Sequence, residues 1–308
     1  MFESYSNKDY SAAFQVVSEM MGKFPEKAGA LYNYAYCIKN IMGDSPRALD
    51  IMEEAAGKGY WTDPKQLESD PDLANLHDNP RFRAFSKKNV ELSIEGKKSL
   101  KPELKILEPS SEKSSKGGHT PLIIALHGNN QSADDAIEQW KFMTGKGWTV
   151  VAPQSSQASM PNAFVWTDFS KAIPEISTHY ENLKHKYRID EKHFIIAGFS
   201  MGGALAAKIC LDQVIPAKRF VLMGPYLADP LDLESSVQEF GSRHGKAYLL
   251  VGENDTECIS GTKKLFEMLK NNGTDCRLEV IPGIAHEYPE GFEQILEKNL
   301  EFLLGNGS

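Results

Sequence analysis

One serine stands between two glycines in the segment Gly198-Phe199-Ser200-Met201-Gly202, after an apolar run and directly before a helical pattern. A strand, a sharp turn and a helix in this order hold a serine hydroxyl exposed at the end of a sheet. The glycines are needed because the strand and the helix approach each other closely. We therefore predict that Ser200 is a nucleophile and that the Met201 backbone N–H faces a developing oxyanion. The structural alternative is a glycine-rich turn with a spectator serine.

A serine hydroxyl is a poor nucleophile unless a base takes its proton. In a strand–turn–helix arrangement of this kind, an acid and then a histidine follow the serine along the chain. Asp255 comes just after one apolar run, and His286 follows the next run in a loop with glycine and proline. We predict that His286 is the base and that Asp255 orients it. Glu253 and Glu257 are the rival acids, and a helix-capping aspartate with a surface-loop histidine is the structural alternative.

A second donor for the oxyanion is expected from the loop after an earlier strand. The apolar run 122–126 ends in His127-Gly128-Asn129-Asn130, and the backbone N–H of Asn129 is the predicted donor. His127 precedes the nucleophile and is interpreted as a structural turn histidine, and His244 precedes the acid instead of following it. Three aromatic side chains near these motifs are candidates for the substrate pocket, although core packing explains each equally well: Trp166, Phe199 and Tyr226.

Residues 99–308 must supply the elements that position these side chains. Short β-rich runs alternate there with helical patterns, which predicts a mostly parallel sheet with helices on both faces. Function collects at the carboxyl ends of such strands, where the motifs above lie. A Ser/Lys/Gly-rich stretch at 110–118 predicts an exposed loop. The expected strands are 103–108, 121–126, 148–152, 194–197, 219–223, 247–251 and 278–281, and the expected helices are 132–142, 171–186, 201–211, 259–270 and 291–304.

Residues 1–98 carry helical spacing of apolar residues instead. Two self-similar segments, at 9–13 and 44–48, place Ala13 and Ala48 35 positions apart, which predicts helix–turn–helix repeats. The stretch ALYNYAYCIKNIMGDSPRALDIMEEA resembles a tetratricopeptide repeat, and it covers about one and a half repeats where a solenoid needs about three. We therefore expect this region to pack on the second region, on another subunit or over the mouth of the active site. A last helix is predicted from Asn79-Pro80 to residue 98.

Composition excludes several classes of protein. The 308 residues include 41% hydrophobic and 25% charged residues, so a large core can be buried, and the net charge is -8. An acidic chain disfavours nucleic acid and anionic membrane surfaces as partners, since both select Lys and Arg. The four cysteines form no CxxC pair or metal-ligand spacing, so no metal is predicted. The first residues do not resemble a secretory signal and no apolar run is long enough to span a membrane, so a cytoplasmic location is expected.

Six motifs together resemble the phospholipase/carboxylesterase branch of the α/β-hydrolases, which includes acyl-protein thioesterases: LIIALHGNN, VVAPQSSQ, AFVWTDF, GFSMGGALA, VGENDTEC and GIAHEYP. The resemblance spans about residues 103–304. It implies hydrolysis of small-molecule carboxylic esters or thioesters without a cofactor, with Ser200, Asp255 and His286 as nucleophile, acid and base. The sequence departs from the family pattern at three places: Val251-Gly252 stands where the family has His-Gly, Met201 stands where Gln is frequent, and the oxyanion loop reads His-Gly-Asn-Asn in place of His-Gly-x-Gly. The departures at Met201 and in the oxyanion loop put the choice of substrate in doubt.

Two other functions remain open from the sequence. A serine peptidase of the same fold would use the same three residues. A protein-interaction module would bind a protein partner or a second copy of the chain through the N-terminal helices, with a catalytically weak second domain. The intact order of serine, acid and histidine argues against the interaction module.

Overall fold

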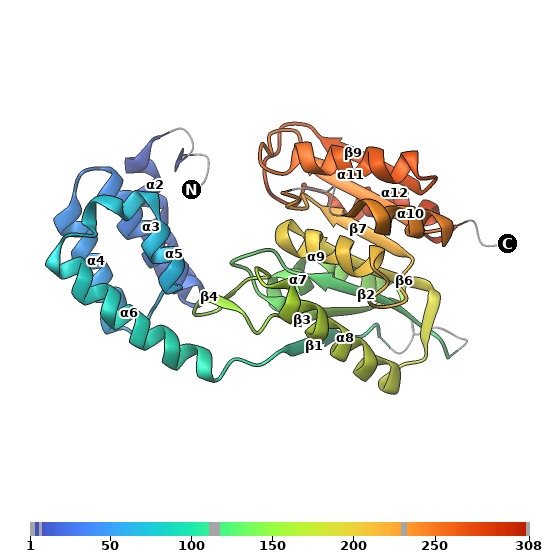
Figure 1. Cartoon of the computed structure of the whole chain (residues 1–308), viewed down its shortest axis with the longest axis horizontal. Coiled ribbons are helices and arrows are strands. Elements are labelled where there is room, and N and C mark those ends of the chain that lie inside the picture. The colour runs from blue at the N-terminus through green and yellow to red at the C-terminus, as the bar shows by residue number, and fades with distance from the viewer. Residues whose placement is uncertain (1–3, 6–7, 111–117, 229–232, 306–308) are drawn as a thin grey trace. The chain divides into compact units, whose positions relative to one another are not determined.

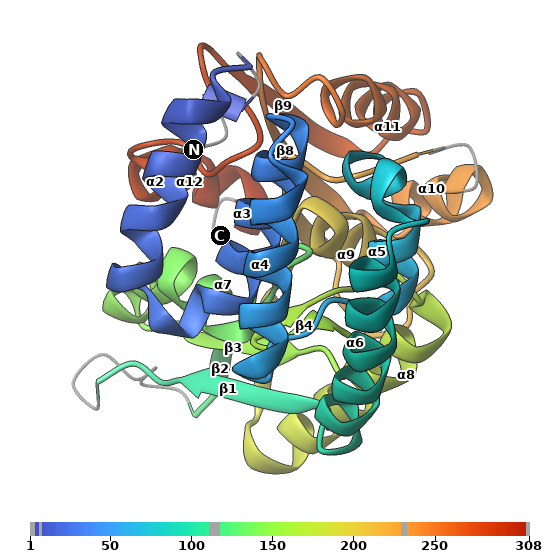
Figure 2. The same ribbon diagram turned by 90° about the vertical axis from the view of Figure 1, so that its left-hand side faces the viewer.

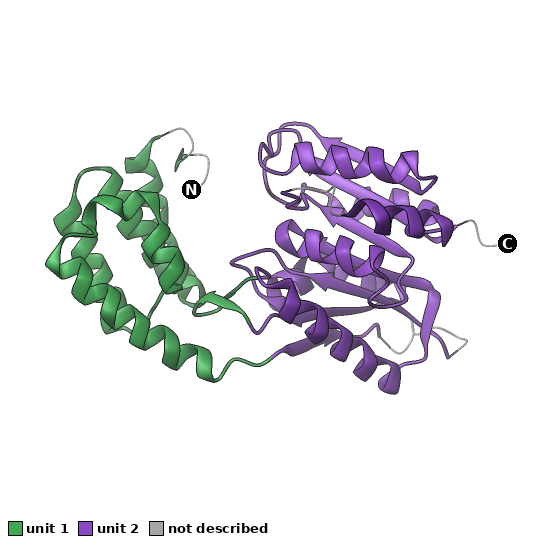
Figure 3. Cartoon of the chain, viewed as in Figure 1, with its two compact units in different colours: residues 1–101, 157–165 green, residues 102–156, 166–308 purple. Residues whose placement is uncertain are grey.

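The chain forms two compact units, which Figure 3 shows in different colours. The computed structural model describes residues 4–5, 8–110, 118–228 and 233–305. Unit 1 consists of Met1–Lys101 with Gln157–Val165, and unit 2 consists of Pro102–Ser156 with Trp166–Ser308. The sequence placed a boundary after residue 98 and assigned the segment Gln157–Val165 to the second region. Within the described residues, no helix combines the length and the apolarity needed to cross a bilayer.

Unit 1 is mainly helical, and α4 packs against both α3 and α6 (Figure 2). The two self-similar segments found in the sequence begin α2 and α4: Asp9 and Asp44 each cap a helix by accepting a hydrogen bond from a backbone N–H of the first turn. Ala13 and Ala48 are both fully buried, as their small size at a helix contact predicts. The helices of the unit are α2 (Tyr10–Lys23), η1 (Pro25–Lys27), α3 (Ala28–Ile41), α4 (Ser45–Gly57), α5 (Pro64–Ser69), η2 (Pro71–Leu76) and α6 (Pro80–Lys98).

A short antiparallel hairpin, β4 (Ala158–Met160) and β5 (Ala163–Phe164), also belongs to unit 1. The backbone N–H of Asp63 donates to the carbonyl oxygen of Ser159 at 2.6 Å. The Asn162 amide donates to the carbonyl oxygen of Glu26 at 3.2 Å. Periodicity did not predict this hairpin, because its strands are too short to show alternation.

Unit 2 contains a seven-stranded sheet in the order β1-β3-β2-β6-β7-β8-β9. The first strand pairs antiparallel with β3, and every other neighbouring pair is parallel. The strands are β1 (Glu103–Leu107), β2 (Thr120–Leu126), β3 (Thr149–Gln154), β6 (Ile189–Phe199), β7 (Arg219–Met223), β8 (Lys246–Gly252) and β9 (Asp275–Ile281). All seven predicted strands are present. Residues 111–117 of the predicted exposed loop lie outside the described residues.

Both faces of this sheet are buried. Along β2, Leu122, Ile124 and Leu126 contribute to one core, whereas Ile123 and Ala125 contribute to the other, because successive side chains point to opposite faces. The first core also contains residues of α8 (Phe169–Lys186), α9 (Ser200–Leu211), α10 (Glu234–Ser242) and α11 (Ile259–Asn271). The second contains residues of α7 (Ala133–Trp140), η3 (Lys141–Lys146) and α12 (Phe292–Leu304). Figure 1 shows α9 beside β6 and β7, on which it packs.

Candidate active site

Ser200 occupies a strained turn between β6 and α9. Its φ is +55°, a left-handed conformation that is uncommon for a residue with a side chain. The glycines on either side permit the turn: a Cβ on Gly198 would lie 2.3 Å from the Gly202 carbonyl oxygen, and one on Gly202 would lie 2.2 Å from the His127 carbonyl oxygen. Any larger residue at either position would collide with backbone. The sequence therefore predicted the reason for both glycines correctly.

The structure brings the three predicted catalytic side chains into one hydrogen-bonded chain. His286 Nδ1 lies 2.7 Å from Asp255 Oδ2, and His286 Nε2 lies 2.8 Å from Ser200 Oγ. Ser200, Asp255 and His286 follow β6, β8 and β9, respectively, so the carboxyl ends of parallel strands bring them to the same edge of the sheet. With the imidazole neutral, Nδ1–H donates to the carboxylate, and Nε2 accepts from the serine hydroxyl.

Two further glycines let the loops around this chain approach each other. A Cβ on Gly252 would lie 2.2 Å from the Ala285 carbonyl oxygen, so the loop of Asp255 and the loop of His286 touch through backbone. Gly224, at φ +48°, would place a Cβ 3.0 Å from Asp255 Oδ2 and 3.2 Å from His286 Nδ1. The sequence gave no signal for Gly224, because only the folded structure brings the end of β7 under this pair.

The rival acid Glu253 serves a different purpose. Its carboxylate accepts a hydrogen bond from the Gly283 backbone N–H at 3.1 Å, which ties together the loops after β8 and β9. Asp255 is 3% exposed, and its second oxygen accepts from the Cys258 backbone N–H at 3.1 Å. A buried carboxylate with two partners is fixed in position, so Asp255 fits the orienting role that the sequence predicted for it.

The ring of His286 rests on an aromatic support that sequence reasoning assigned differently. Phe199 stacks on the imidazole with a centroid distance of 4.7 Å and an interplanar angle of 29°. Tyr288 packs on Phe199 at 5.1 Å and receives a hydrogen bond from the Trp140 indole at 3.3 Å. Phe199 is only 6% exposed, so it lies beneath the histidine and does not form an open pocket wall.

The predicted oxyanion donors lie at the ends of neighbouring elements. The N–H of Met201 belongs to the first turn of α9, where backbone donors have no partner within the helix. Asn129 follows β2 in the loop of His127, and the carbonyl of His127 lies against Gly202 at the start of α9. The loop after β2 and the start of α9 therefore meet beside Ser200.

His127 is a neutral structural histidine, as the sequence indicated. Its Nδ1 lies 2.8 Å from the Gly128 carbonyl oxygen, and its ring is buried. Burial lowers the pKa of His127 to about 4, because the positively charged imidazolium would lose its hydration. His127 therefore carries no charge near the site at neutral pH.

The other two proposed pocket residues differ sharply in exposure. Trp166 is fully buried, and its indole N–H donates to the His127 carbonyl oxygen at 2.9 Å, so it packs inside the unit and does not line an open pocket. Tyr226 is 40% exposed, and its backbone N–H donates to the Ser200 carbonyl oxygen at 3.0 Å. Of the three aromatic candidates, Tyr226 alone has substantial surface beside the serine.

Two groups of side chains in the described residues have the proximity that a metal site requires. The first is Asp255, Cys258 and His286, whose carboxylate and imidazole are already hydrogen-bonded to each other. The Asp255 carboxylate also accepts from the Cys258 backbone N–H, and the His286 imidazole also faces Ser200 Oγ, so both groups are already bound to other partners. The chemistry of this set therefore fits the serine triad better than a metal.

The second group, Cys37, Asp70 and Asp72, lies in unit 1. Burial raises the pKa of the Cys37 thiol. Asp70 accepts from the Asp72 backbone N–H at 2.9 Å, and Asp72 accepts from the Tyr5 hydroxyl at 2.6 Å. These carboxylates have structural roles: Asp70 caps η2 and Asp72 binds the Tyr5 hydroxyl.

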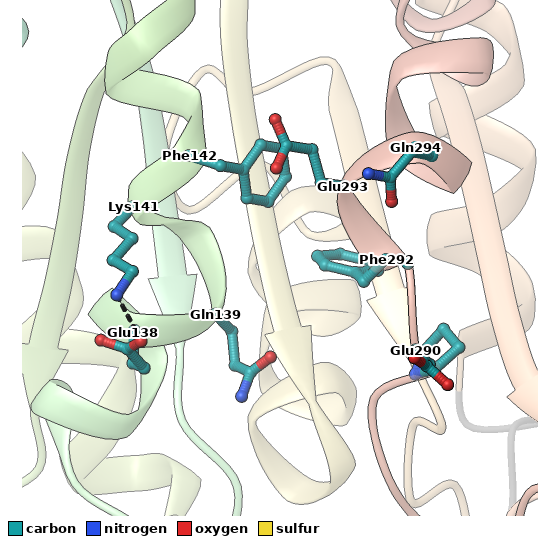
Figure 4. Close-up of a pocket in the computed structure, with 10 residues that line it drawn as sticks. Glu138, Gln139, Lys141, Phe142, Glu290, Phe292, Glu293 and Gln294 are labelled. Carbon is teal, nitrogen blue, oxygen red and sulfur yellow. Dashed lines mark hydrogen bonds and ion pairs between the residues drawn. The ribbon is translucent and has the colours of Figure 1, made fainter.

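A groove of about 580 Å³ opens in unit 2 where η3 and the last turn of α7 face the start of α12 (Figure 4). Phe142 and Phe292 form its apolar part, and Glu138, Glu290 and Glu293 supply carboxylates. Lys141 forms an ion pair with Glu138. None of the residues lining this groove belongs to the Ser200–His286–Asp255 chain.

Two family models match the sequence. Residues 1–95 match the N-terminal domain of A/B hydrolase-like proteins, and residues 118–248 match the family described as serine aminopeptidase, S33. An uncharacterized protein from Bacillus cereus ATCC 10987 has a similar structure over both units: it is 26% identical, the match covers 98% of this chain and 96% of that one, and the TM-score is 0.58. The protein has an α/β-hydrolase fold preceded by an N-terminal helical domain. This confirms the predicted fold class.

Two further solved structures resemble the α/β-hydrolase part. Esterase PE8 is 20% identical, with 66% of this chain and 99% of that chain covered and a TM-score of 0.56. Est1E from Butyrivibrio proteoclasticus is 14% identical, with 67% and 94% covered and a TM-score of 0.51. At these identities the likeness concerns the fold alone. A comparison with curated proteins found no match. The resemblance of residues 1–98 to a tetratricopeptide repeat stays a prediction.

Proposed function

We propose that the protein hydrolyses carboxylic esters or thioesters through an acyl-enzyme intermediate on Ser200. The observation that carries this proposal is the unbroken chain from Asp255 through His286 to Ser200, with distances of 2.7 Å and 2.8 Å. The strained backbone of Ser200 at φ +55° supports it, since strain of this kind clusters at catalytic positions. The name of esterase PE8, a neighbour with the same fold, agrees with this chemistry.

In the acylation step, Ser200 Oγ attacks the acyl carbonyl carbon while His286 Nε2 takes the hydroxyl proton. The carbonyl oxygen becomes an oxyanion, which the backbone N–H groups of Met201 and Asn129 stabilise. The N-terminus of α9 adds a favourable partial positive charge at the same place. When the tetrahedral intermediate collapses, His286 returns the proton to the leaving alcohol or thiol.

In the deacylation step, water takes the place of the leaving group. His286 Nε2 accepts a proton from this water, whose oxygen attacks the acyl carbon bound to Ser200. A second tetrahedral intermediate releases the carboxylic acid and restores the serine hydroxyl. Throughout both steps Asp255 keeps Nδ1 protonated and stabilises the imidazolium that forms each time.

A serine peptidase is the second candidate, because residues 118–248 match a family described as a serine aminopeptidase. The two activities share the triad, and they differ in the leaving group, which is an amine in a peptidase. An amine leaves only after His286 has protonated it, so the same geometry can serve either reaction. The choice between the two must therefore come from substrate panels.

The test compares a p-nitrophenyl ester series of increasing acyl length, a thioester and an aminoacyl p-nitroanilide series. Ser200→Ala should lower kcat by several orders of magnitude. Ser242→Ala is the matched control, since this hydroxyl caps the end of α10 and lies outside the triad. Turnover of the anilides with little turnover of the esters would favour the peptidase. Full activity of the Ser200→Ala protein would exclude both.

A further inference from the structure

Trp166 holds the loop that carries the second predicted oxyanion donor. Its indole N–H donates to the His127 carbonyl oxygen at 2.9 Å, and its backbone N–H donates to Asn129 Oδ1, also at 2.9 Å. Its ring stacks on the His127 imidazole at a centroid distance of 4.7 Å. These contacts hold the loop on both sides of Gly128. One buried residue, through its ring and its backbone N–H, therefore helps to hold the loop that carries the Asn129 backbone N–H.

The loop that Trp166 holds also touches the nucleophile turn. The carbonyl oxygen of His127 occupies the space where a Cβ of Gly202 would be, at 2.2 Å. A Cβ on Gly128 would lie 2.7 Å from the ring of Phe199. A shift of this loop would therefore change the separation between the two oxyanion donors, which belong to the loop and to α9.

We propose that Trp166 is a positioning residue for the oxyanion loop. This inference rests on the proposed serine hydrolase function. The sequence placed Trp166 in the substrate pocket. In this proposal Trp166 does not touch the substrate and acts only by positioning the loop.

The first test is Trp166→Phe, which keeps an aromatic ring but removes the indole N–H. Loss of a whole oxyanion donor costs about 10²–10³ in kcat, so a displaced donor should cost about ten- to hundredfold. KM should change less than about threefold, because the interaction strengthens only in the transition state. The inhibition constant of a trifluoromethyl ketone, which forms a hemiketal oxyanion on Ser200, should rise by the same factor as kcat falls.

Trp148→Phe is the matched control. Trp148 is a buried tryptophan of the same unit that precedes β3, at the opposite end of the parallel strands from Ser200. It should lose stability like Trp166→Phe but keep kcat and the inhibition constant. If both variants lose the same small fraction of kcat, Trp166 has only a packing role and the proposal is overturned.

Asn129→Ala is the second variant, in case Trp166→Phe fails to fold. It keeps the backbone N–H of the predicted donor but removes the side-chain oxygen that Trp166 binds. The proposal expects a fall in kcat and a matching rise in the inhibition constant, whereas wild-type values would overturn it. Ser200→Ala separates this question from the function itself: if that variant stays active, the hydrolase mechanism fails, whatever Trp166 does.

Discussion

Replacing Asp255 by asparagine should remove most of the proposed hydrolase activity while leaving the fold intact, because of how the carboxylate is bound. One oxygen accepts from the Cys258 backbone N–H at 3.1 Å, and the other faces His286 Nδ1 at 2.7 Å. In the Asp255→Asn protein, the amide oxygen must face the Cys258 N–H, since the opposite orientation would bring two donors together. The amide NH₂ then points at His286.

This orientation changes the tautomer of the histidine. Nδ1 must become the acceptor for the amide NH₂, so the proton moves to Nε2, which faces Ser200 Oγ at 2.8 Å. A protonated Nε2 cannot take the serine proton. The same change in a serine protease triad lowers kcat by about 10⁴, which corresponds to about 5 kcal/mol of transition-state stabilisation.

The assay is kcat/KM for a short-chain p-nitrophenyl ester, with thermal unfolding to show that the variant is folded. Glu253→Gln is the matched control: it makes the same chemical change in the same loop, and its amide oxygen can still accept from the Gly283 N–H. We expect nearly wild-type activity for Glu253→Gln. If Asp255→Asn keeps more than about a tenth of wild-type activity, the argument that Cys258 selects the amide orientation is refuted.

Three further predictions follow from the same geometry. Gly202→Ala should destabilise the protein by about 3 kcal/mol or more in thermal or denaturant unfolding, because its Cβ would lie 2.2 Å from the His127 carbonyl oxygen. The control is Gly57→Ala on α4, where nothing lies within 4 Å of the Cβ position, and it should stabilise the protein by up to about 1 kcal/mol. Phe199→Leu should lower kcat about three- to tenfold, since it removes stacking of about 0.5–1.5 kcal/mol under the His286 ring, and unchanged kcat with a folded protein would contradict this role. The pKa of His127 falls from 6.5 to about 4 on folding, so between pH 4 and 6.5 the unfolded chain binds more protons than the folded one. The melting temperature should therefore fall as the pH drops from about 6.5 to 4. In the His127→Gln protein, the melting temperature should depend less on pH over this range.

The local parts of the fold could be predicted from sequence because each has its own pattern. The five central strands of the sheet contain apolar runs that are buried on both faces, and the helices between them have helical spacing. The hairpin 157–165 and α10 (Glu234–Ser242) were missed. The strands of the hairpin are two or three residues long, and its partners in α3 and in the loop before α5 are distant in sequence. A pattern within one segment cannot reveal contacts of this kind.

For the site, residue types and chain order determined the candidates for nucleophile, acid and base. Glycines around Ser200 are required by a local turn, and the order serine, acid, histidine follows from the order of the strands. Only the tertiary structure distinguishes Asp255 from Glu253, which are two residues apart and both carboxylates. It does so through direction: one carboxylate faces His286 and the other a backbone N–H of the next loop.

The same distinction explains the aromatic residues. The sequence showed that Phe199, Trp166 and Tyr226 lie near the motifs, but it could not show which way each side chain points. The structure places Phe199 under the histidine, Trp166 against the loop after β2 and Tyr226 at the surface. Local sequence determines what a residue can do, because that depends on its chemistry and its backbone. What it touches depends on segments far away in the chain, and only the packing of the whole unit decides that.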